Sequence, residues 1–527
     1  MTAFSALQRI PRLFPLILLV PFAAFLAVSL ASGLPDFTAT GDEALLEIAT
    51  RNTAAGRTFT GPYSRFRFHH PGPLYFFLRI PVYYLSGGSA SADYVSAALI
   101  SAVSLLLTAV VIRKSASSAG VLAFCSLAAV YLWSLTPDIW LSYWNPFVII
   151  FPVVLTFTAL SAVSSGRHRL LPLAAASGTF ALQTHISTFI PLAFGFAWAL
   201  VPLLKKSRRG DINGAGSLKR SLLWTAGILL LLWLPVILHE AVSDTGGNLR
   251  PLAAFFSSTS PEMTLKGAAA VWADAVSGME SSFVCGAWAR RAGVVLHVKG
   301  ILVLLRLALL SLMLILLRRR RLRGFPLHLC VSALILHAGT LLSVMMIRGE
   351  PHAYLMVWFS AAGLISWTAV ALSLGQMLIS TGKAESMRYA PWVMTAVLAV
   401  FSVLNTVSVL NREGGRPYDP LSLHSADLHR LCENLVPELE PRDTGGWRIA
   451  PEHHHDWPLM AGLVNCLQKR GIQAEVTEDF LFMTGVAPDS GWRTLRITSG
   501  RETEETEEPL AESGPLRVFL ELAPSSD

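Results

Sequence analysis

The sequence predicts a polytopic, all-α membrane protein that ends in a small α/β domain. Hydrophobic residues make up 53% of the 527 residues and charged residues only 15%, which excludes an ordinary soluble globular protein. Long apolar runs recur as far as residue 410, with basic residues in short clusters between them. After Asn411 the long apolar runs stop and charged residues become common. We therefore expect a transmembrane domain over 1–411 and a separate domain over 412–527.

About eleven apolar segments approach the roughly 20 residues that a helix needs to cross a bilayer. The first is expected to be a retained signal anchor, because its apolar stretch exceeds a signal-peptide core and the Ser-Gly-Leu-Pro after it is a poor cleavage site. The segments near 119 and 170 are short enough to tilt, break or re-enter. The predicted spans lie at about 13–34, 94–112, 119–135, 146–165, 170–183, 186–204, 221–241, 297–317, 326–347, 355–379 and 391–410.

The orientation follows from the basic clusters, because lysine and arginine gather in cytoplasmic loops. One side carries Arg9/Arg12, Arg113/Lys114, Arg167/Arg169, Lys205–Arg220, Arg318–Arg323 and Lys383/Arg388. The loops 34–93, 136–145, 242–296 and 348–354, and the domain after Asn411, then face outward from an inner (plasma) membrane, as a periplasmic or other extracytoplasmic domain does. Since topology accounts for the net charge of +7, we exclude nucleic acid as a partner.

The outer C-terminal domain is expected to mix helices and strands. Helical patterns cover 428–439 and 457–471, and strand-like pieces lie at 447–450, 474–477 and 517–522. The acidic stretch 502–514 is poor in apolar residues and is expected to be an exposed or disordered loop. Cys432 and Cys466 fall on the two helices, and the sequence leaves open whether they form a disulfide or two buried thiols.

The first outer loop concentrates acids, arginines, paired histidines and aromatic residues. Asp42 and Glu43 open a segment with helical apolar spacing, for which we predict an amphipathic helix on the membrane. Thr40 and Glu43 match a capping box, which is a structural role, and Asp42 also suits a helix first turn. The alternative is that Asp42 removes a proton from an acceptor hydroxyl.

The stretch after Tyr63 has the glycine and proline content of a bent, helix-free path that presents the side chains from Arg65 to His70 together. Arg65, His69 and His70 then suit a phosphate, because guanidinium and imidazole groups donate hydrogen bonds to its oxygens. The alternative is anchoring at the membrane interface, which we favour for Arg67 and Arg79.

The motifs of this region resemble those of the GT-C superfamily of membrane glycosyltransferases, within it the branch of protein O-mannosyltransferases and lipid A aminoarabinose transferases. The resemblance rests on the Asp42–Glu43 pair, on Pro-Gly-Pro-Leu-Tyr-Phe-Phe-Leu running into Tyr-Tyr-Leu-Ser-Gly, and on Ser-Ala-Asp-Tyr-Val-Ser-Ala-Ala before the second span. The many-helix body and outer domain match more loosely. The branch usually has Lys-Pro-Pro where this chain has His70-Pro-Gly-Pro, so details of donor binding are expected to differ.

The resemblance implies transfer of a sugar from a polyprenyl-phosphate carrier, with Asp42 and Glu43 supplying the base. It also implies that a late outer loop holds the carrier phosphate, which here contains Arg348, His352 and Tyr354. Gln183 and His185 either line the cavity with Tyr63 or belong to an ordinary helix connection. Trp140 and Trp144 are expected to be interface anchors.

The expected activity is that of an inverting hexosyl- or pentosyltransferase at the outer membrane face. Its partners would be the lipid-linked donor, membrane lipids and a lipid, glycan or protein acceptor. The sequence has no metal-ligand spacing, the histidines at 453–455 suit a solvated loop, and no cofactor is expected. The alternatives are a polysaccharide polymerase or ligase, and a transporter or flippase of lipid-linked sugars.

Overall fold

The computed structural model describes residues 13–33, 37–208, 215–242, 247–257, 263–284, 295–383, 385, 388–411, 425–442, 445–499 and 508–521. Arg9, Arg12, the middle of the basic cluster at 205–220 and the first part of the acidic stretch lie outside these residues. The chain forms two compact units. The first comprises 1–28, 97–234 and 256–415, and the second comprises 29–96, 235–255 and 416–527.

The predicted spans correspond closely to the helices. Within the described residues, ten helices are long and apolar enough to cross a membrane, and they match ten of the eleven predicted segments. The eleventh, near 170, is α10, whose 14 residues make about 21 Å of helix, short of the ~30 Å hydrocarbon core. The long helices and α10 are α2 (Leu13–Ala31), α5 (Ser91–Ser115), α6 (Ser118–Leu135), α9 (Ile150–Ser164), α10 (Leu171–Thr184), α11 (Phe189–Arg208), α12 (Ala215–Val242), α17 (Val295–Arg319), α18 (Phe325–Met345), α19 (Ala361–Ser380) and α20 (Ala390–Leu410).

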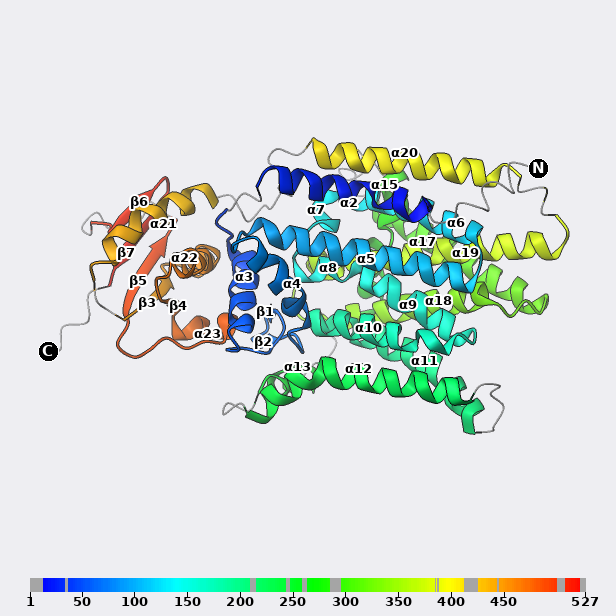
Figure 1. Cartoon of the computed structure of the whole chain (residues 1–527), viewed down its shortest axis with the longest axis horizontal. Helices are drawn as coiled ribbons and strands as arrows, with labels where there is room; N and C mark the ends of the chain where they lie inside the picture. The colour runs from blue at the N-terminus through cyan, green and yellow to red at the C-terminus, as the bar shows by residue number, and fades with distance from the viewer. Residues whose placement is uncertain are drawn as a thin grey trace. The chain divides into compact units, whose positions relative to one another are not determined.

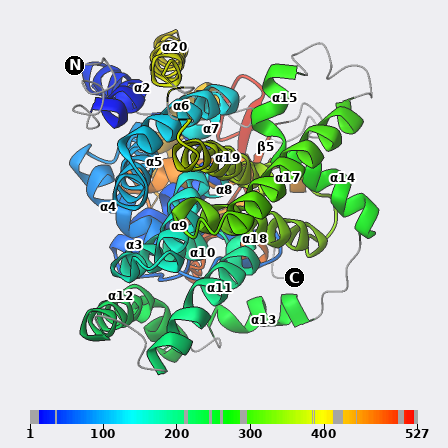
Figure 2. The same ribbon diagram turned by 90° about the vertical axis from the view of Figure 1, so that its right-hand side faces the viewer.

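Helix α9 is at the centre of the first unit. It packs against α10, α11, α18 and α19 (Figure 2). Nearly all of its residues are buried, which explains why it is apolar on every face. Trp140, in the short helix α7 (Pro137–Trp140), is also buried, with its ring centroid 4.7 Å from that of Phe22. The expectation that Trp140 anchors the chain at the lipid interface is therefore wrong, because protein side chains cover it.

The C-terminal part of the second unit is a mixed five-stranded sheet in the order β4-β3-β5-β7-β6 (Figure 1). Strand β3 is parallel to both β4 and β5, whereas β5–β7 and β7–β6 are antiparallel. Helix α22 packs on β3 and β4, and α21 on β6 and β7. The bounds are α21 (Ser425–Leu439), β3 (Trp447–Pro451), α22 (Trp457–Lys469), β4 (Ala474–Val476), α23 (Leu481–Thr484), β5 (Arg493–Thr498), β6 (Ala511–Ser513) and β7 (Leu516–Leu520).

Both predicted helices and all three predicted strands are present, but β5 and β6 were not predicted from the sequence. Strand β6 falls inside the acidic stretch 502–514, so the prediction of a loop is wrong for that end. Ala511 faces the core while Glu512 is exposed, and such alternation over only three residues is too short a signal to detect.

The remaining elements of the second unit come from the segment between the first two long apolar helices and from the segment before residue 256. They are α3 (Gly41–Ala54), β1 (Tyr63–Ser64), β2 (Phe68–His69), α4 (Leu74–Leu85) and most of α13 (Leu249–Ser257). Ala44, Leu45 and Ile48 of α3 belong to the same apolar core as α21, α22 and the sheet. The expectation that α3 lies on the membrane is therefore wrong, because its apolar stripe packs into the α/β domain.

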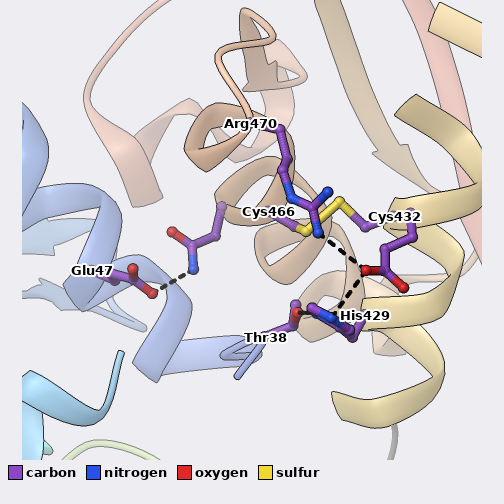
Figure 3. Close-up of a disulfide and its surroundings, with 8 residues drawn as sticks. Thr38, Glu47, His429, Cys432, Cys466 and Arg470 are labelled. Atoms are coloured by element: carbon purple, nitrogen blue, oxygen red, sulfur yellow. Dashed lines mark hydrogen bonds and ion pairs between the residues drawn. A yellow bond between two sulfur atoms is a disulfide. The ribbon is translucent and has the colours of Figure 1, made fainter. Parts of the chain in front are cut away.

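Cys432 on α21 and Cys466 on α22 form a disulfide, with their Cα atoms 6.5 Å apart (Figure 3). This decides the alternative that the sequence left open. The bridge joins the two helices of the domain in its core, where both cysteines are buried.

Candidate active site

The two acids at the start of α3 have different surroundings. Between residues 41 and 50 only Asp42 and Ala49 are partly exposed, and the other residues are buried. Seven residues is about two helical turns, so Asp42 and Ala49 share one face of α3. Leu45, Leu46 and Ala49 of this helix line a small pocket, which places Asp42 on the side of the helix that the pocket reaches.

Glu43, by contrast, is buried and accepts a hydrogen bond from the Tyr94 hydroxyl at 3.2 Å. The Thr40 side chain makes no capping hydrogen bond, so the threonine half of the predicted capping box is absent. Glu43 instead connects α3 to the first turn of α5. Of the two predicted catalytic acids, Asp42 is the one on the accessible face.

Arg79 of α4 is fully buried and forms an ion pair with Asp93 at the start of α5. Its Nε lies 3.1 Å from Asp93 Oδ1 and its Nη2 2.5 Å from Oδ2, and its Nη1 donates to the Leu46 carbonyl at 3.0 Å. The expectation that Arg79 reaches lipid headgroups is wrong, because the protein supplies all of these partners. The sequence signal for this pair was an acid in the first turn of an otherwise apolar span, which must be paired if it is buried.

The segment after Tyr63 is a short antiparallel hairpin, with Tyr63 opposite His69 and Ser64 opposite Phe68. Arg65 and Arg67 are exposed, while Phe68 and His70 are buried. The guanidinium of Arg65 lies 4.9 Å from the ring centroid of Phe66, and that of Arg67 lies 5.3 Å from that of Phe482. Arg65 and Arg67 lie in the turn between the two strands, whereas His70 follows β2. That Arg65 and His70 act on one ligand stays a prediction.

His69 is held by both its ring and its backbone. Its Nδ1 lies 3.2 Å from the Gly61 carbonyl oxygen, and burial lowers the pKa of His69 to about 4. The ring is therefore neutral at pH 7, so it offers a phosphate hydrogen bonding but no positive charge. Asn248 bonds to the His69 backbone, a contact that nothing in the sequence indicated.

The pocket beside α3 has a neutral lining. It is formed by residues of α3, the hairpin and its approach, α4 and α23, and it contains no side chain that is charged at pH 7. Tyr63 is among its residues. The others are Leu45, Leu46, Ala49, Thr58, Thr60, Gly61, Pro62, His69, Phe76, Met483 and Thr484. Hydroxyl groups and apolar walls suit an uncharged, hydroxyl-bearing group better than a phosphate.

The other predicted site residues belong to the first unit. Tyr354 stacks on Trp144 at 4.6 Å between centroids and on His352 at 5.6 Å, and Arg348 is partly buried in the segment just before them. Gln183 is buried and donates to the Leu232 carbonyl at 2.9 Å. His185 is also buried, with its Nδ1 2.6 Å from Ser187 Oγ.

In the part of the chain that the structure describes, no group of three or more histidine, cysteine or acidic side chains is placed to hold a metal ion. The rings of His453 and His455 stack on each other at 5.3 Å, and both side chains are exposed.

No family model matches this chain, and neither does any curated protein sequence. Solved structures do match. ArnT from Cupriavidus metallidurans bound to undecaprenyl phosphate aligns over 95% of this chain and 98% of its own, with a TM-score of 0.54 and 14% identity. The apo state of the same protein aligns over 94% and 97%, with a TM-score of 0.55 and 13% identity.

The chain thus shares the fold of these structures over 94–95% of its length, in agreement with the fold class that the sequence motifs predicted. ArnT is a solved structure that this chain resembles over nearly its whole length. At 13–14% identity the shared property is the fold.

Proposed function

We propose that this protein is a membrane glycosyltransferase that moves a sugar from a polyprenyl-phosphate carrier to a lipid, glycan or protein acceptor. A full-length fold match to a protein solved with undecaprenyl phosphate supports the class of donor. A fold alone does not assign an activity. The observation that carries the proposal is the difference between the acids of α3. Glu43 and Glu47 are buried in internal contacts, whereas Asp42 is partly exposed on the face of the helix whose Leu45, Leu46 and Ala49 line a pocket.

In the proposed reaction the acceptor oxygen attacks the anomeric carbon of the donor sugar. The bond from that carbon to the phosphate oxygen breaks, the polyprenyl phosphate leaves, and the acceptor's proton passes to the Asp42 carboxylate. Arg65, His70 and Arg348 offset the charge that develops on the leaving phosphate, with His69, His352 and Tyr354 as further hydrogen-bonding groups. A single base and direct displacement give inversion at the anomeric carbon.

We place the reaction at the outer face of an inner membrane. Basic clusters mark the cytoplasmic side, and two of them, Arg167/Arg169 and the cluster at 205–220, lie before α10 and after α11. The chain must therefore cross the membrane in α10 and return in α11, although α10 has only 14 residues. The segment with α3 follows the first span and is outside whether or not α10 crosses, and counting α10 as a span places the α/β domain after the eleventh span on the same side. The Cys432–Cys466 disulfide supports this placement, because such bridges persist in oxidising compartments.

Mass analysis of the host's lipids and surface glycans tests the proposal, with the host carrying the wild type, no protein, or Asp42→Asn. The sugar modification should appear only with the wild type, because Asp42→Asn keeps the shape but lowers turnover by about 10²- to 10⁴-fold, as general-base loss does. Carrier binding should persist in this variant. Glu43→Gln is the control and should retain far more activity.

Three outcomes would contradict the proposal. Normal transfer by Asp42→Asn would show that Asp42 is not the base. A product with retained anomeric configuration would show that the reaction is not a direct displacement. Movement of lipid-linked sugar that continues unchanged in Asp42→Asn, with no new glycoside formed, would favour the transporter alternative.

A further inference from the structure

Glu47 of α3 is a completely buried carboxylate with partners from two other helices. Tyr83 of α4 donates to Oε1 at 2.9 Å, and Lys469 of α22 lies 3.0 Å from the same oxygen. Asn465 of α22 donates to Oε2 at 2.7 Å (Figure 3). Burying charges costs more than an apolar contact of the same size, so their presence here indicates a geometric role rather than added stability.

The side chains of α22 that reach α3 form one stripe. Gly462, Asn465 and Lys469 are spaced by three and four residues, which places them on one face of the helix. Gly462 lies against the start of α3, where an added Cβ would be 2.8 Å from the Ala39 carbonyl oxygen. Gln468, beside this stripe, accepts a hydrogen bond from Arg51 at 2.9 Å. The α/β domain therefore contacts α3 from its N-terminus to its third turn.

Glu47 and Asp42 are five residues apart, so their side chains leave the α3 axis in directions about 140° apart. Holding Glu47 therefore fixes the rotation of α3 about its axis, and with it the direction of Asp42. Apolar packing of Ala44, Leu45 and Ile48 holds the helix against the core. Apolar packing is not directional, whereas the hydrogen bonds to Glu47 are.

We propose that Asn465 and Lys469 of the C-terminal domain are positioning residues, which orient the catalytic base Asp42 through Glu47. This inference rests on the proposed function of Asp42. It makes the α/β domain part of the active-site scaffold, although its anchoring residues touch neither donor nor acceptor.

The test uses the full-length protein in lipid nanodiscs with a polyprenyl-phosphate sugar as donor. Asn465→Leu and Lys469→Met remove the anchoring groups at nearly constant volume, and rates are normalised to the folded fraction. We expect kcat to fall by about 10- to 100-fold, as displacement of a catalytic group by ~1 Å does, while the donor KM changes much less. Lys469→Arg should restore most of kcat, because it keeps the charge.

Arg470→Met is the matched control, because Arg470 follows Lys469 but is exposed and forms only a surface ion pair with Glu433 at 3.5 Å. Amide hydrogen exchange over 41–54 should become faster in Asn465→Leu and Lys469→Met and not in Arg470→Met. Hydrogen exchange does not depend on catalysis, so it tests the positioning role of Asn465 and Lys469 separately from the catalytic role of Asp42. An Asp42→Asn variant as active as the wild type would overturn the proposed function.

The positioning role is overturned if Asn465→Leu and Lys469→Met keep a wild-type kcat. It is also overturned if exchange over 41–54 does not change, or if the donor KM rises in parallel with the loss of kcat.

Discussion

Asn248 pairs with the backbone of His69 much as a neighbouring strand would. Its Oδ1 accepts from the His69 amide at 2.8 Å, and its Nδ2 donates to the His69 carbonyl oxygen at 2.8 Å. Glu240 Oε1 in turn accepts from the backbone amides of Asn248 and Leu249, at 2.7 and 3.0 Å. A segment after α12 thus holds the hairpin that carries the predicted phosphate-binding residues.

Asn248→Ala should therefore weaken carrier binding. The variant loses both hydrogen bonds to the His69 backbone, which costs on the order of 1–3 kcal/mol at ~0.5–1.5 kcal/mol each. The measurement is the affinity for polyprenyl phosphate in nanodiscs. Asn434→Ala is the control, because Asn434 also donates to a backbone carbonyl, that of Glu512, away from the hairpin. A loss of affinity that is equal in the two variants would show that Asn248 has no special role.

Arg65→Ala and Arg348→Ala should each reduce carrier affinity. A charge-assisted hydrogen bond to phosphate contributes about 1.5–3 kcal/mol, which corresponds to roughly 10- to 100-fold in affinity. Arg67→Gln is the control, since the Arg67 guanidinium lies over the Phe482 ring. The competition of free polyprenyl phosphate with a labelled analogue provides the measurement. Unchanged affinity in both the Arg65 and the Arg348 variants would defeat the assignment.

Glu475 of β4 should make stability depend on pH. Burial raises the pKa of Glu475 from 4.5 to about 7, against the opposing effect of Arg57 and Arg51. Between these two values the folded state binds more protons than the unfolded state, so the stability from this group is complete below pH 4.5 and is lost as pH rises to about 7.

Glu475→Gln should remove this loss. The variant should match the wild type near pH 4.5 and exceed it at pH 8 by up to about 3 kcal/mol, because a tenfold change in a protonation equilibrium corresponds to ~1.4 kcal/mol. Thermal unfolding of the full-length protein in detergent at the two pH values measures the difference. Glu478→Gln, at an exposed neighbouring position, should leave the pH dependence unchanged. Identical pH profiles for Glu475→Gln and the wild type would contradict the prediction.

The disulfide gives a test of sidedness. The bridge holds two of the cysteines, so under denaturing conditions reduction should make two further thiols, those of Cys432 and Cys466, react with an alkylating reagent. Removing the bridge with Cys432→Ala should cost about 3–4 kcal/mol for a loop of this length, on a chain-entropy estimate. Reaction of Cys432 and Cys466 without reduction, or a C-terminal reporter active only in the cytoplasm, would argue against an outer domain.

The sequence by itself determined most of the membrane architecture. Ten of the spans could be located because a helix that crosses a bilayer must be apolar over a length set by the bilayer, whatever its neighbours are. Two helices and three strands of the C-terminal domain followed from local periodicity in the same way. The motif around Asp42 also led to the correct fold.

Only the tertiary structure decided what covers each face. Periodicity shows that α3 has an apolar stripe but does not say whether membrane or protein covers it, and the answer lies in α22, more than 400 residues away. The same holds for Arg79, which finds Asp93 instead of lipid, and for Glu43, which is bonded to Tyr94. Which residue pairs with a buried polar side chain depends on which distant segments the fold brings within hydrogen-bonding distance. The local sequence around the side chain does not contain that information.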